Sequence, residues 1–436
     1  MKREDLLSKI SDPSKVWDVV VIGGGATGLG VAVDAVTRGY SVALFEWEDF
    51  AKATSSRSTK LVHGGVRYLA QGDVSLVLEA LYERGLLQQN APHLVKNQSF
   101  LIPNYRYWDN FLYTVGLTIY DILAGRLSLG RSKYVSKKKT TSYLPTVRVD
   151  GLKGGVVYHD GQFDDSRLAV NLAQSCVENG GCPINRMKVT AILHGSDGRA
   201  RGVKVQDLMN GQEYEVKAKA VINATGIFVD SIMEMDVPTH EHMVKPSQGV
   251  HLVLDKSFLQ SDYAIMIPKT DDGRVLFAVP WHDKVVVGTT DTLREHPELE
   301  PQALESEIEF ILNTAGRYLT RKPQRSDVLS VFAGLRPLAA PKKEGKSTKE
   351  ISRSHKIFVS ENKLITITGG KWTTYRRMAE DTVDKAIELN LLEKKACVTK
   401  KFRIHGYQLN PDLNNHLYIY GSDIQAIKTL MQSDPA

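Results

Sequence analysis

The chain contains 436 residues, of which 42% are hydrophobic and 24% are charged. This composition is typical of a soluble globular protein with two or three domains and excludes a largely disordered chain. The net charge of +6 modestly favours anionic ligands or surfaces. The three cysteines have neither the spacing of a disulfide framework nor that of metal ligands, which favours a protein of a reducing compartment that binds no metal.

The N-terminal segment predicts no targeting sequence. Residues 1–15 are charged and lack the apolar core and small-residue cleavage site of a secretory signal. They also lack the Arg-rich, acid-poor character of an organellar presequence. No apolar run in the chain reaches the roughly 20 residues that span a bilayer.

A nucleotide-binding turn is the first element with chemical meaning. The β-branched run Val16–Ile22 predicts a buried parallel strand, and Gly23, Gly25 and Gly28 follow it at the G-x-G-x-x-G spacing. Glu46 ends a second predicted strand 23 residues after Gly23, where a carboxylate can accept hydrogen bonds from ribose hydroxyls. A carboxylate at this place argues against a 2′-phosphate, so the pattern favours FAD or NAD over NADP.

The next stretch, Ser58–Leu69, has the sequence STKLVHGGVRYL. It places Lys60, His63, Arg67 and Tyr68 around a pair of glycines in an otherwise half-apolar segment. A solvated loop would explain the lysine alone. The stretch therefore predicts the wall of a site.

An apolar segment follows at residues 111–125, with Tyr105, Tyr107 and Trp108 before it and a basic cluster after it at residues 126–139. This combination predicts either an in-plane contact with an anionic membrane surface or a packed core helix with a solvated tail. The two interpretations carry equal weight on the sequence alone.

Later segments return to the nucleotide-binding pattern. Residues 221–226 predict a buried strand that ends in small residues, and residues 364–390 predict a strand, a Gly-Gly turn and a helix. Together with the first turn, they predict one discontinuous nucleotide-binding domain. That layout is typical of flavoproteins and favours FAD over NAD. Between these segments, residues 264–292 predict antiparallel strands with an Asp272-Gly273 hairpin.

Eight motifs of the chain, in their order, resemble those of the FAD-dependent glycerol-3-phosphate dehydrogenases. Their residues are more similar to the mitochondrial subgroup than to the short bacterial form. The motifs are VVVIGGGATGLG, TSSRSTKLVHGGVRYL, YHDGQFDDSRL, VINATG, PSQGVHLVLD, VVVGTTDT, AGLRPL and GGKWTTYRRMAEDT. The resemblance implies an α/β fold, α+β overall, with a Rossmann-like FAD-binding domain and an antiparallel-sheet substrate domain. The implied boundaries are 16–74, 151–234 and 356–390 for the FAD-binding domain, 75–150 and 235–355 for the substrate domain, and 391–436 for the start of a C-terminal helical domain, truncated or naturally short.

The resemblance also implies the site. Family membership implies oxidation of sn-glycerol 3-phosphate to dihydroxyacetone phosphate, with a hydride passing from C2 to flavin N5. The residues implied to bind the cofactor are Gly23, Gly25, Ala26, Thr27, Gly28, Glu46, Thr54, Ser55, Ser58, Lys60, His63, Gly64, Gly65, Ala224, Thr225, Gly226, Gly370, Lys371, Thr373 and Thr374. The substrate-binding candidates are Arg67, Tyr68, Thr290, Arg336 and Lys371, and the catalytic candidates are His63, His251, Arg336 and Lys371.

Roles within the site follow from side-chain chemistry. Arg336 and Arg67 suit the phosphate because a guanidinium binds it through two donors, and Lys371 suits the negative charge of a reduced flavin. An imidazole near its ordinary pKa of about 6.5 can accept the hydroxyl proton, and both His63 and His251 are candidates for this base.

Several alternatives stay open on the sequence. The leading hypothesis is a peripheral enzyme of the cytoplasmic or mitochondrial inner membrane that passes electrons to a quinone of a respiratory chain, and a homodimer is compatible with it. The alternatives are an oxidase that reduces O2 to H2O2 and a non-catalytic module with a structural or sensory flavin. A nucleic-acid partner is not expected, because the basic residues are scattered without a stacking platform.

Overall fold

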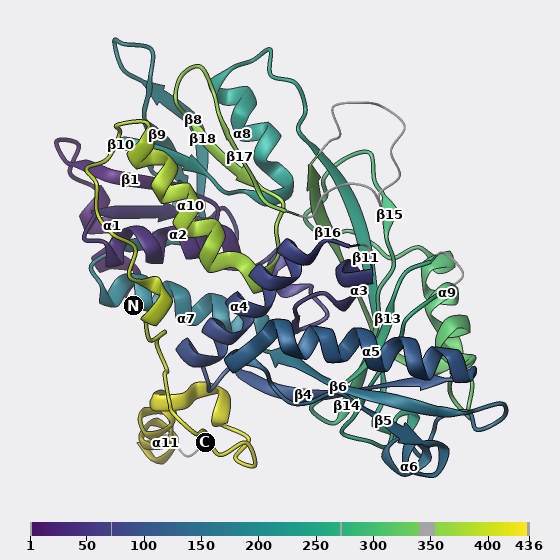
Figure 1. Ribbon diagram of the computed structural model, residues 1–436. Helices are drawn as coiled ribbons and strands as arrows, with labels where there is room; N and C mark the ends of the chain where they lie inside the picture. Colours follow the sequence, from purple (N-terminus) through teal and green to yellow (C-terminus); the bar gives the residue numbers. More distant parts are fainter. Residues whose placement is uncertain (1, 71, 271–272, 340–353, 434–436) are drawn as a thin grey trace.

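Two β-sheets organise the chain (Figure 1). The structure is a computed structural model that describes residues 2–70, 72–270, 273–339 and 354–433, without the side chains of residues 67 and 70. The α-helices are α1 (Arg3–Ile10), α2 (Ala26–Thr37), α3 (Val66–Ala70), α4 (Val74–Asn90), α5 (Tyr107–Ala124), α6 (Lys137–Tyr143), α7 (Asp165–Glu178), α8 (Val229–Asp236), α9 (Glu305–Gly316), α10 (Tyr375–Glu388) and α11 (Ile424–Ser433).

The strands and short 3-10 helices complete the described elements. The strands are β1 (Val16–Ile22), β2 (Val42–Phe45), β3 (Leu61–Val62), β4 (Val95–Asn104), β5 (Lys133–Ser136), β6 (Gly154–Phe163), β7 (Cys182–Ile184), β8 (Met187–His194), β9 (Ala200–Asp207), β10 (Glu213–Asn223), β11 (Val244–Asp255), β12 (Ala264–Ile267), β13 (Leu276–Trp281), β14 (Lys284–Gly288), β15 (Thr292–Leu293), β16 (Val328–Ala339), β17 (Lys356–Val359) and β18 (Ile365–Thr368). The 3-10 helices are η1 (Thr54–Ser56), η2 (Gly125–Leu127), η3 (Gly226–Phe228), η4 (Lys256–Phe258), η5 (Arg325–Asp327), η6 (Trp372–Thr374), η7 (Thr399–Lys401) and η8 (Tyr418–Asp423).

The first sheet has a parallel centre. Within the described ranges its strand order is β17-β18-β10-β1-β2-β7, with the β8-β9 hairpin attached to β10. Strands β18, β10, β1, β2 and β7 run parallel to one another. Helix α2 contacts both α7 and α10, and the three helices bury one face of this sheet, while α1, α8 and the β8-β9 hairpin cover the other. Burial on both faces explains why β1 is an almost uninterrupted β-branched run.

The second sheet is mainly antiparallel. Its order is β15-β11-β14-β13-β12-β4-β6-β3 over the part of the chain that is described, and β16 pairs along β11. The predicted meander at 264–292 is confirmed, because β12, β13 and β14 pair antiparallel in succession. Asp272 of the predicted hairpin lies outside the described residues. Helix α9 packs against one face of this sheet, and α5 packs near β6 on the opposite face (Figure 1).

One predicted boundary needs correction. Residues 151–163 were predicted for the first domain, but β6 pairs with β4 in antiparallel register over the ten residues of each strand. β3 then pairs with β6, so it also belongs to the second sheet. The chain therefore leaves the second sheet after Phe163, and α7 is the next element that packs on the first sheet. The other predicted domain boundaries stay predictions.

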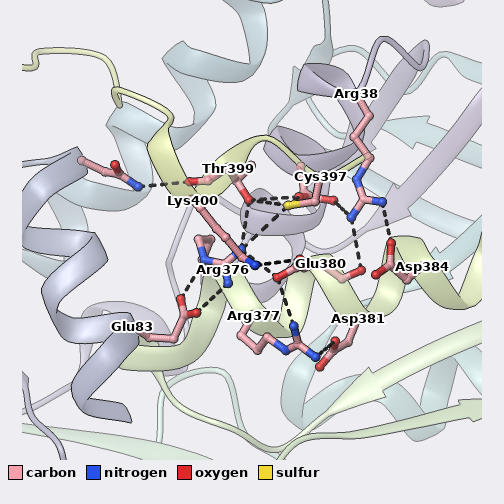
Figure 2. Close-up of polar contacts among 12 residues, drawn as sticks. Arg38, Glu83, Arg376, Arg377, Glu380, Asp381, Asp384, Cys397, Thr399 and Lys400 are labelled. Atoms are coloured by element: carbon pink, nitrogen blue, oxygen red, sulfur yellow. Dashed lines mark hydrogen bonds and ion pairs between the residues drawn. The ribbon is translucent and has the colours of Figure 1, made fainter. Parts of the chain in front are cut away.

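A network of buried and half-buried charges fixes the helices that cover the first sheet (Figure 2). Arg376 on α10 donates to Glu83 on α4 at 2.8 Å and to Glu380, one turn along α10, at 2.9 Å. Arg38, at the end of α2, pairs with Asp384 of α10 at 2.5 Å. The network holds the start of α10, which follows the Gly-Gly turn, against α4, and it holds the second half of α10 against the end of α2.

The predicted apolar stripe of α10 is confirmed. Of the expected stripe members, Met378, Ala379, Thr382, Val383 and Ala386 are buried, and the sixth, Ile387, is partly buried against the same core. Across the described ranges, no helix combines the length and apolarity needed to cross a bilayer.

Candidate active site

A cavity of about 530 Å³ lies where the carboxyl ends of the parallel strands meet the second sheet. Its walls include Gly23, Glu46 and Ala224 from the first sheet. His251 and Arg336 from the second sheet line it as well. The cavity therefore extends from the nucleotide-binding turn to the antiparallel strands, which is the shape that an extended dinucleotide requires.

The turn after β1 can be built only from glycines. Gly23 has φ +104°, and a Cβ there would lie 2.8 Å from the carbonyl oxygen of Ala224. A Cβ on Gly28 would lie 1.9 Å from the carbonyl oxygen of Gly23, so Gly28 allows α2 to pack on β1. Gly25, Ala26 and Thr27 line the cavity, whereas Gly28 contributes to packing.

Glu46 stands beside this turn, as the sequence predicted. One carboxylate oxygen accepts the Gly24 N–H at 2.6 Å, and the other accepts the Glu48 N–H at 2.8 Å. Burial raises the pKa of Glu46, and the two amide donors oppose that shift. The oxygens keep lone pairs that can accept further donors, such as ribose hydroxyls.

Residues of the 3-10 helix η1 connect the nucleotide-binding turn with the second sheet. Thr54 donates to the Leu335 carbonyl at 2.7 Å, and the Ser55 hydroxyl accepts the Ala26 N–H at the start of α2 at 2.9 Å. Both residues line the cavity and tie the two sheets together at its edge.

Ser58 and Lys60 face a buried carboxylate. The Ser58 hydroxyl donates to Asp165 at 2.6 Å, and Lys60 Nζ pairs with the same residue at 2.6 Å. Ser58 also lines the cavity, but Lys60 is not among its described lining residues. The structure thus shows Lys60 as an anchor for the start of α7 rather than on the predicted cofactor side.

The HGG turn brings the predicted side chains to the cavity. His63 lines it, and its N–H donates to the Thr373 hydroxyl at 3.3 Å. Gly65 has φ +76°, and a Cβ on Gly64 would lie 2.5 Å from the Leu81 side chain. Gly64 therefore serves packing, whereas Gly65 lines the cavity. The side chain of Arg67 lies outside the described part of the structure.

Lys371 extends from the Gly-Gly turn across the cavity toward the HGG turn. Its Nζ lies 4.0 Å from the centre of the Tyr68 ring, a cation–π contact. Gly369 and Gly370 have φ +79° and +74°, which favours glycine at both positions. Thr373 lines the cavity, whereas the Thr374 hydroxyl donates to the Lys371 carbonyl at 3.3 Å.

Arg336 enters the cavity from β16. Its Nη2 donates to the Thr289 hydroxyl at 3.1 Å, and its Nη1 donates to the Gln248 carbonyl at 3.3 Å. A Cβ on Gly249 would lie 2.3 Å from Nη2, so this glycine makes room for the guanidinium. Asp291 lies 3.7 Å from Nη1 and partly balances the charge.

Thr290, a predicted substrate-binding residue, is buried and hydrogen-bonded within the protein. Its hydroxyl donates to Glu307 at 2.8 Å and accepts the Val250 N–H at 3.0 Å. Thr290 lines the cavity, but the neighbouring Thr289 makes the contact with Arg336.

The expectation of an ordinary imidazole pKa is wrong for His251. The residue is 2% exposed, and burial, with the charges of Arg336 and Lys60, lowers its pKa to about 3. Its Nε2 lies 2.9 Å from the Thr59 hydroxyl, and its ring stacks on Phe332 with centres 4.8 Å apart. His251 is therefore a neutral group at physiological pH.

The third nucleotide-binding segment follows β10. Ala224, Thr225 and Gly226 line the cavity, and the Ala224 N–H donates to the Ile22 carbonyl at 2.9 Å. Gly226 has φ +63°, which completes the turn. Together, the three turns fit FAD: each glycine-rich backbone comes close to the same cavity, and a carboxylate and a lysine lie at different positions along it.

Sequence reasoning missed three residues that line the cavity, Asp160 on β6 and Thr59 and Arg274 in loops. Arg274 donates to the Asp291 carbonyl at 2.8 Å, and Asp160 and Thr59 also contribute to the wall. Asp160 carried a signal, since a charged residue within the buried strand β6 requires a partner. Arg274 carried no comparable local signal.

The family model described as FAD dependent oxidoreductase matches residues 18–376. The mitochondrial glycerol-3-phosphate dehydrogenase of Schizosaccharomyces pombe is 43% identical over 430 residues, covering 93% of this chain and 66% of that protein. The corresponding protein of Saccharomyces cerevisiae is 40% identical over 447 residues, covering 93% of this chain and 69% of that protein. The chain thus spans about two thirds of the length of these curated relatives.

A solved structure agrees with these relatives. The glycerol-3-phosphate dehydrogenase from Bacillus halodurans complexed with FAD has a TM-score of 0.75 and 33% identity, covering 99% of this chain and 73% of that chain. The predicted fold class, family and cofactor are confirmed. The chain belongs to the FAD-dependent glycerol-3-phosphate dehydrogenase family.

Proposed function

We propose that the chain oxidises sn-glycerol 3-phosphate to dihydroxyacetone phosphate with FAD as cofactor. The observation that carries the proposal is that Lys371 and Arg336, from different sheets, line the same cavity as the nucleotide-binding turns. An anionic substrate and a redox cofactor would therefore meet between two fixed cations. The printed names of the relatives support the same reaction.

The turns at Gly23–Gly28, Ala224–Gly226 and Gly370–Thr374, together with Glu46, would hold the cofactor. FAD, when bound, supplies the acceptor for a hydride. Lys371 would place a positive charge near the flavin, where negative charge develops on reduction, and its ammonium group is held against the Tyr68 ring.

Arg336 would bind the substrate phosphate. Its two terminal nitrogens match the geometry of phosphate oxygens, and Thr289 and Gln248 hold the guanidinium plane. The role of Arg67 in the same task stays a prediction.

His63 would accept the hydroxyl proton. It lines the cavity, whereas His251, with a pKa of about 3, is too weak a base for that task. His251 would instead be a neutral hydrogen-bonding residue in the cavity wall.

We expect His63→Asn to slow flavin reduction by about 100-fold and His251→Asn to slow it much less. Equal losses in stopped-flow reduction would reject this assignment.

The electron acceptor in our proposal is a membrane quinone. Helix α5 supports this choice because Trp108, Phe111 and Ile122 are 67%, 59% and 71% exposed beside a basic segment. Such a face suits the surface of an anionic membrane, and the relatives are named mitochondrial, which supports the mitochondrial inner membrane. A homodimer stays a prediction.

The acceptor can be tested with purified, FAD-loaded protein. We expect dihydroxyacetone phosphate to form under argon when glycerol 3-phosphate and a soluble quinone analogue are both present. In air without quinone, we expect little peroxide. Peroxide equimolar with product would establish the oxidase alternative, and absence of product under both conditions would reject the proposed reaction.

A further inference from the structure

A chain of buried hydrogen bonds leads from helices α4 and α5 to the HGG turn. The Gly64 N–H donates to the Tyr120 hydroxyl oxygen at 2.7 Å, and this hydroxyl donates to Asp160 Oδ2 at 2.8 Å. Arg84 Nη1 donates to Asp160 Oδ1 at 2.7 Å. Tyr120, Asp160 and Arg84 are 1%, 2% and 1% exposed, so water competes little for these bonds.

The members of this chain have defined hydrogen-bonding roles. Burial, followed by the negative charge of Asp160, raises the pKa of Tyr120 well above its usual value, so the phenol keeps its proton. Burial raises the pKa of Asp160 as well, and the Arg84 charge opposes that shift. Arg84 is held by a second bond, from Nη2 to the Leu127 carbonyl at 3.0 Å. The HGG turn is therefore linked by hydrogen bonds, through Tyr120, to the Asp160–Arg84 ion pair, whose members lie on β6 and α4.

Gly64 is shaped for this contact. A Cβ at this position would lie 2.6 Å from the Tyr120 hydroxyl and 2.5 Å from the Leu81 side chain, so only a glycine lets the phenol reach the backbone. Its neighbours His63 and Gly65 line the cavity, and Asp160 lines it from β6. The hydrogen bond thus acts on the centre of a turn whose two sides face the cofactor cavity.

We propose that Tyr120 is a positioning residue that, together with Asp160 and Arg84, holds the His63–Gly65 turn in the shape that receives FAD. Without the hydroxyl, the Gly64 N–H would lose its acceptor at 2.7 Å and Asp160 would lose a donor, so the Asp160 carboxylate would be the remaining acceptor for this amide. The turn would then shift toward that carboxylate, and the cavity wall would move with it. The inference rests on the proposed function only for the presence of FAD, not for the substrate.

The test compares Tyr120→Phe with Tyr113→Phe. Tyr113 lies on the same helix and is half-buried, and its hydroxyl makes no hydrogen bond with the residues that the structure describes. For Tyr120→Phe we expect the FAD dissociation constant to rise about tenfold, since a buried donor loses its partner. We also expect an altered visible flavin spectrum and faster amide hydrogen exchange in peptides covering residues 61–66. Tyr113→Phe should match the unsubstituted protein in all three measurements.

Equal FAD affinity, spectrum and exchange in Tyr120→Phe and Tyr113→Phe would overturn the inference. The unsubstituted holoprotein provides a second test that does not depend on either variant folding. The Gly64 amide should exchange as slowly as the amides of β6, and exchange at the rate of an exposed loop would overturn the inference. If glycerol 3-phosphate fails to reduce the flavin while Tyr120→Phe still weakens FAD binding, the proposed reaction fails and this inference stands.

Discussion

The conformation of Arg336 depends on residues of β11 and of the loop after β14. Gly249 on β11 has no side chain at the point where the guanidinium passes, and Thr289 and Gln248 hold its two terminal nitrogens. The guanidinium of Arg336 is therefore restrained before the substrate binds, and its side chain loses little rotamer entropy on binding.

Arg336→Ala tests the phosphate role. We expect KM for glycerol 3-phosphate to rise about 100-fold, equivalent to about 3 kcal/mol for charge-assisted bonds, with FAD still bound. Arg336→Lys keeps the charge but loses the fork, and we expect a smaller rise of about tenfold. Steady-state kinetics on variants with an intact flavin spectrum provide the measurement. A KM within twofold of the original for Arg336→Ala would remove this residue from substrate binding.

His251 predicts how stability changes with pH. Its folded pKa of about 3 lies below the ordinary 6.5, so between these values the folded protein binds fewer protons than the unfolded chain. The free energy of unfolding should therefore decrease as the pH falls from about 6.5 toward 3. This residue should account for about 2 kcal/mol between pH 6.5 and 5, at about 1.4 kcal/mol per pH unit.

Urea unfolding of the FAD-loaded protein at several pH values measures this slope. His251→Asn should show a shallower loss of stability on acidification, while His296→Asn, at an exposed histidine, should follow the original protein. Parallel slopes for all three proteins would contradict the buried neutral imidazole.

Individual residues differed in how well the sequence could predict them. The backbone demands of a tight turn are local, so the place of Gly23 in the turn and of Glu46 beside it could be inferred from spacing. Lys60 and His251 could not, because the Asp165 partner of one and the burial of the other arise from distant segments.

At the scale of elements, α5 has two unlike faces. Its inner face carries Tyr120 and Leu117, which are 1% exposed, while its outer face carries Trp108 and Phe111 among a row of exposed apolar side chains. Monomeric soluble proteins rarely expose a contiguous apolar face, so the outer face favours a contact surface. The structure thus favours the first of the two interpretations that the sequence left open.

Replacing Trp108 and Phe111 with serine tests the membrane contact. We expect the affinity for phosphatidylcholine vesicles that contain phosphatidylserine to fall at least about tenfold, because the variant lacks the two large apolar side chains that would be buried in the membrane interface. Serine at Leu208 and Met209, which are also exposed but lie on another surface, provides the control. Vesicle flotation should show a selective loss in the α5 variant, and equal binding of both variants would exclude α5 as the contact.

Elements with a strong local sequence pattern could be predicted. Sheet membership that depends on pairing with a strand far away in the sequence could not. The strand, glycine turn and helix of β1 and α2 followed from periodicity and spacing. The membership of β6 in the second sheet depends on its pairing with β4, about 60 residues away, which periodicity cannot reveal.

At the scale of the whole molecule, the site exists only where the two sheets meet. Three chain segments from the first sheet supply the backbone turns, and β11 and β16 of the second sheet supply His251 and Arg336. The sequence predicted this discontinuous layout because each segment repeated the strand and glycine pattern. It could not predict the Arg274 and Asp160 positions, since these depend on how the sheets are placed.

Anaerobic addition of glycerol 3-phosphate to the purified, FAD-loaded protein tests the proposed function most directly. The visible absorption band of the oxidised flavin should bleach with one equivalent of substrate, and dihydroxyacetone phosphate should appear in equal amount. Glycerol, which lacks the phosphate that Arg336 would bind, should leave the spectrum unchanged. An unbleached flavin at saturating glycerol 3-phosphate would contradict the proposed reaction.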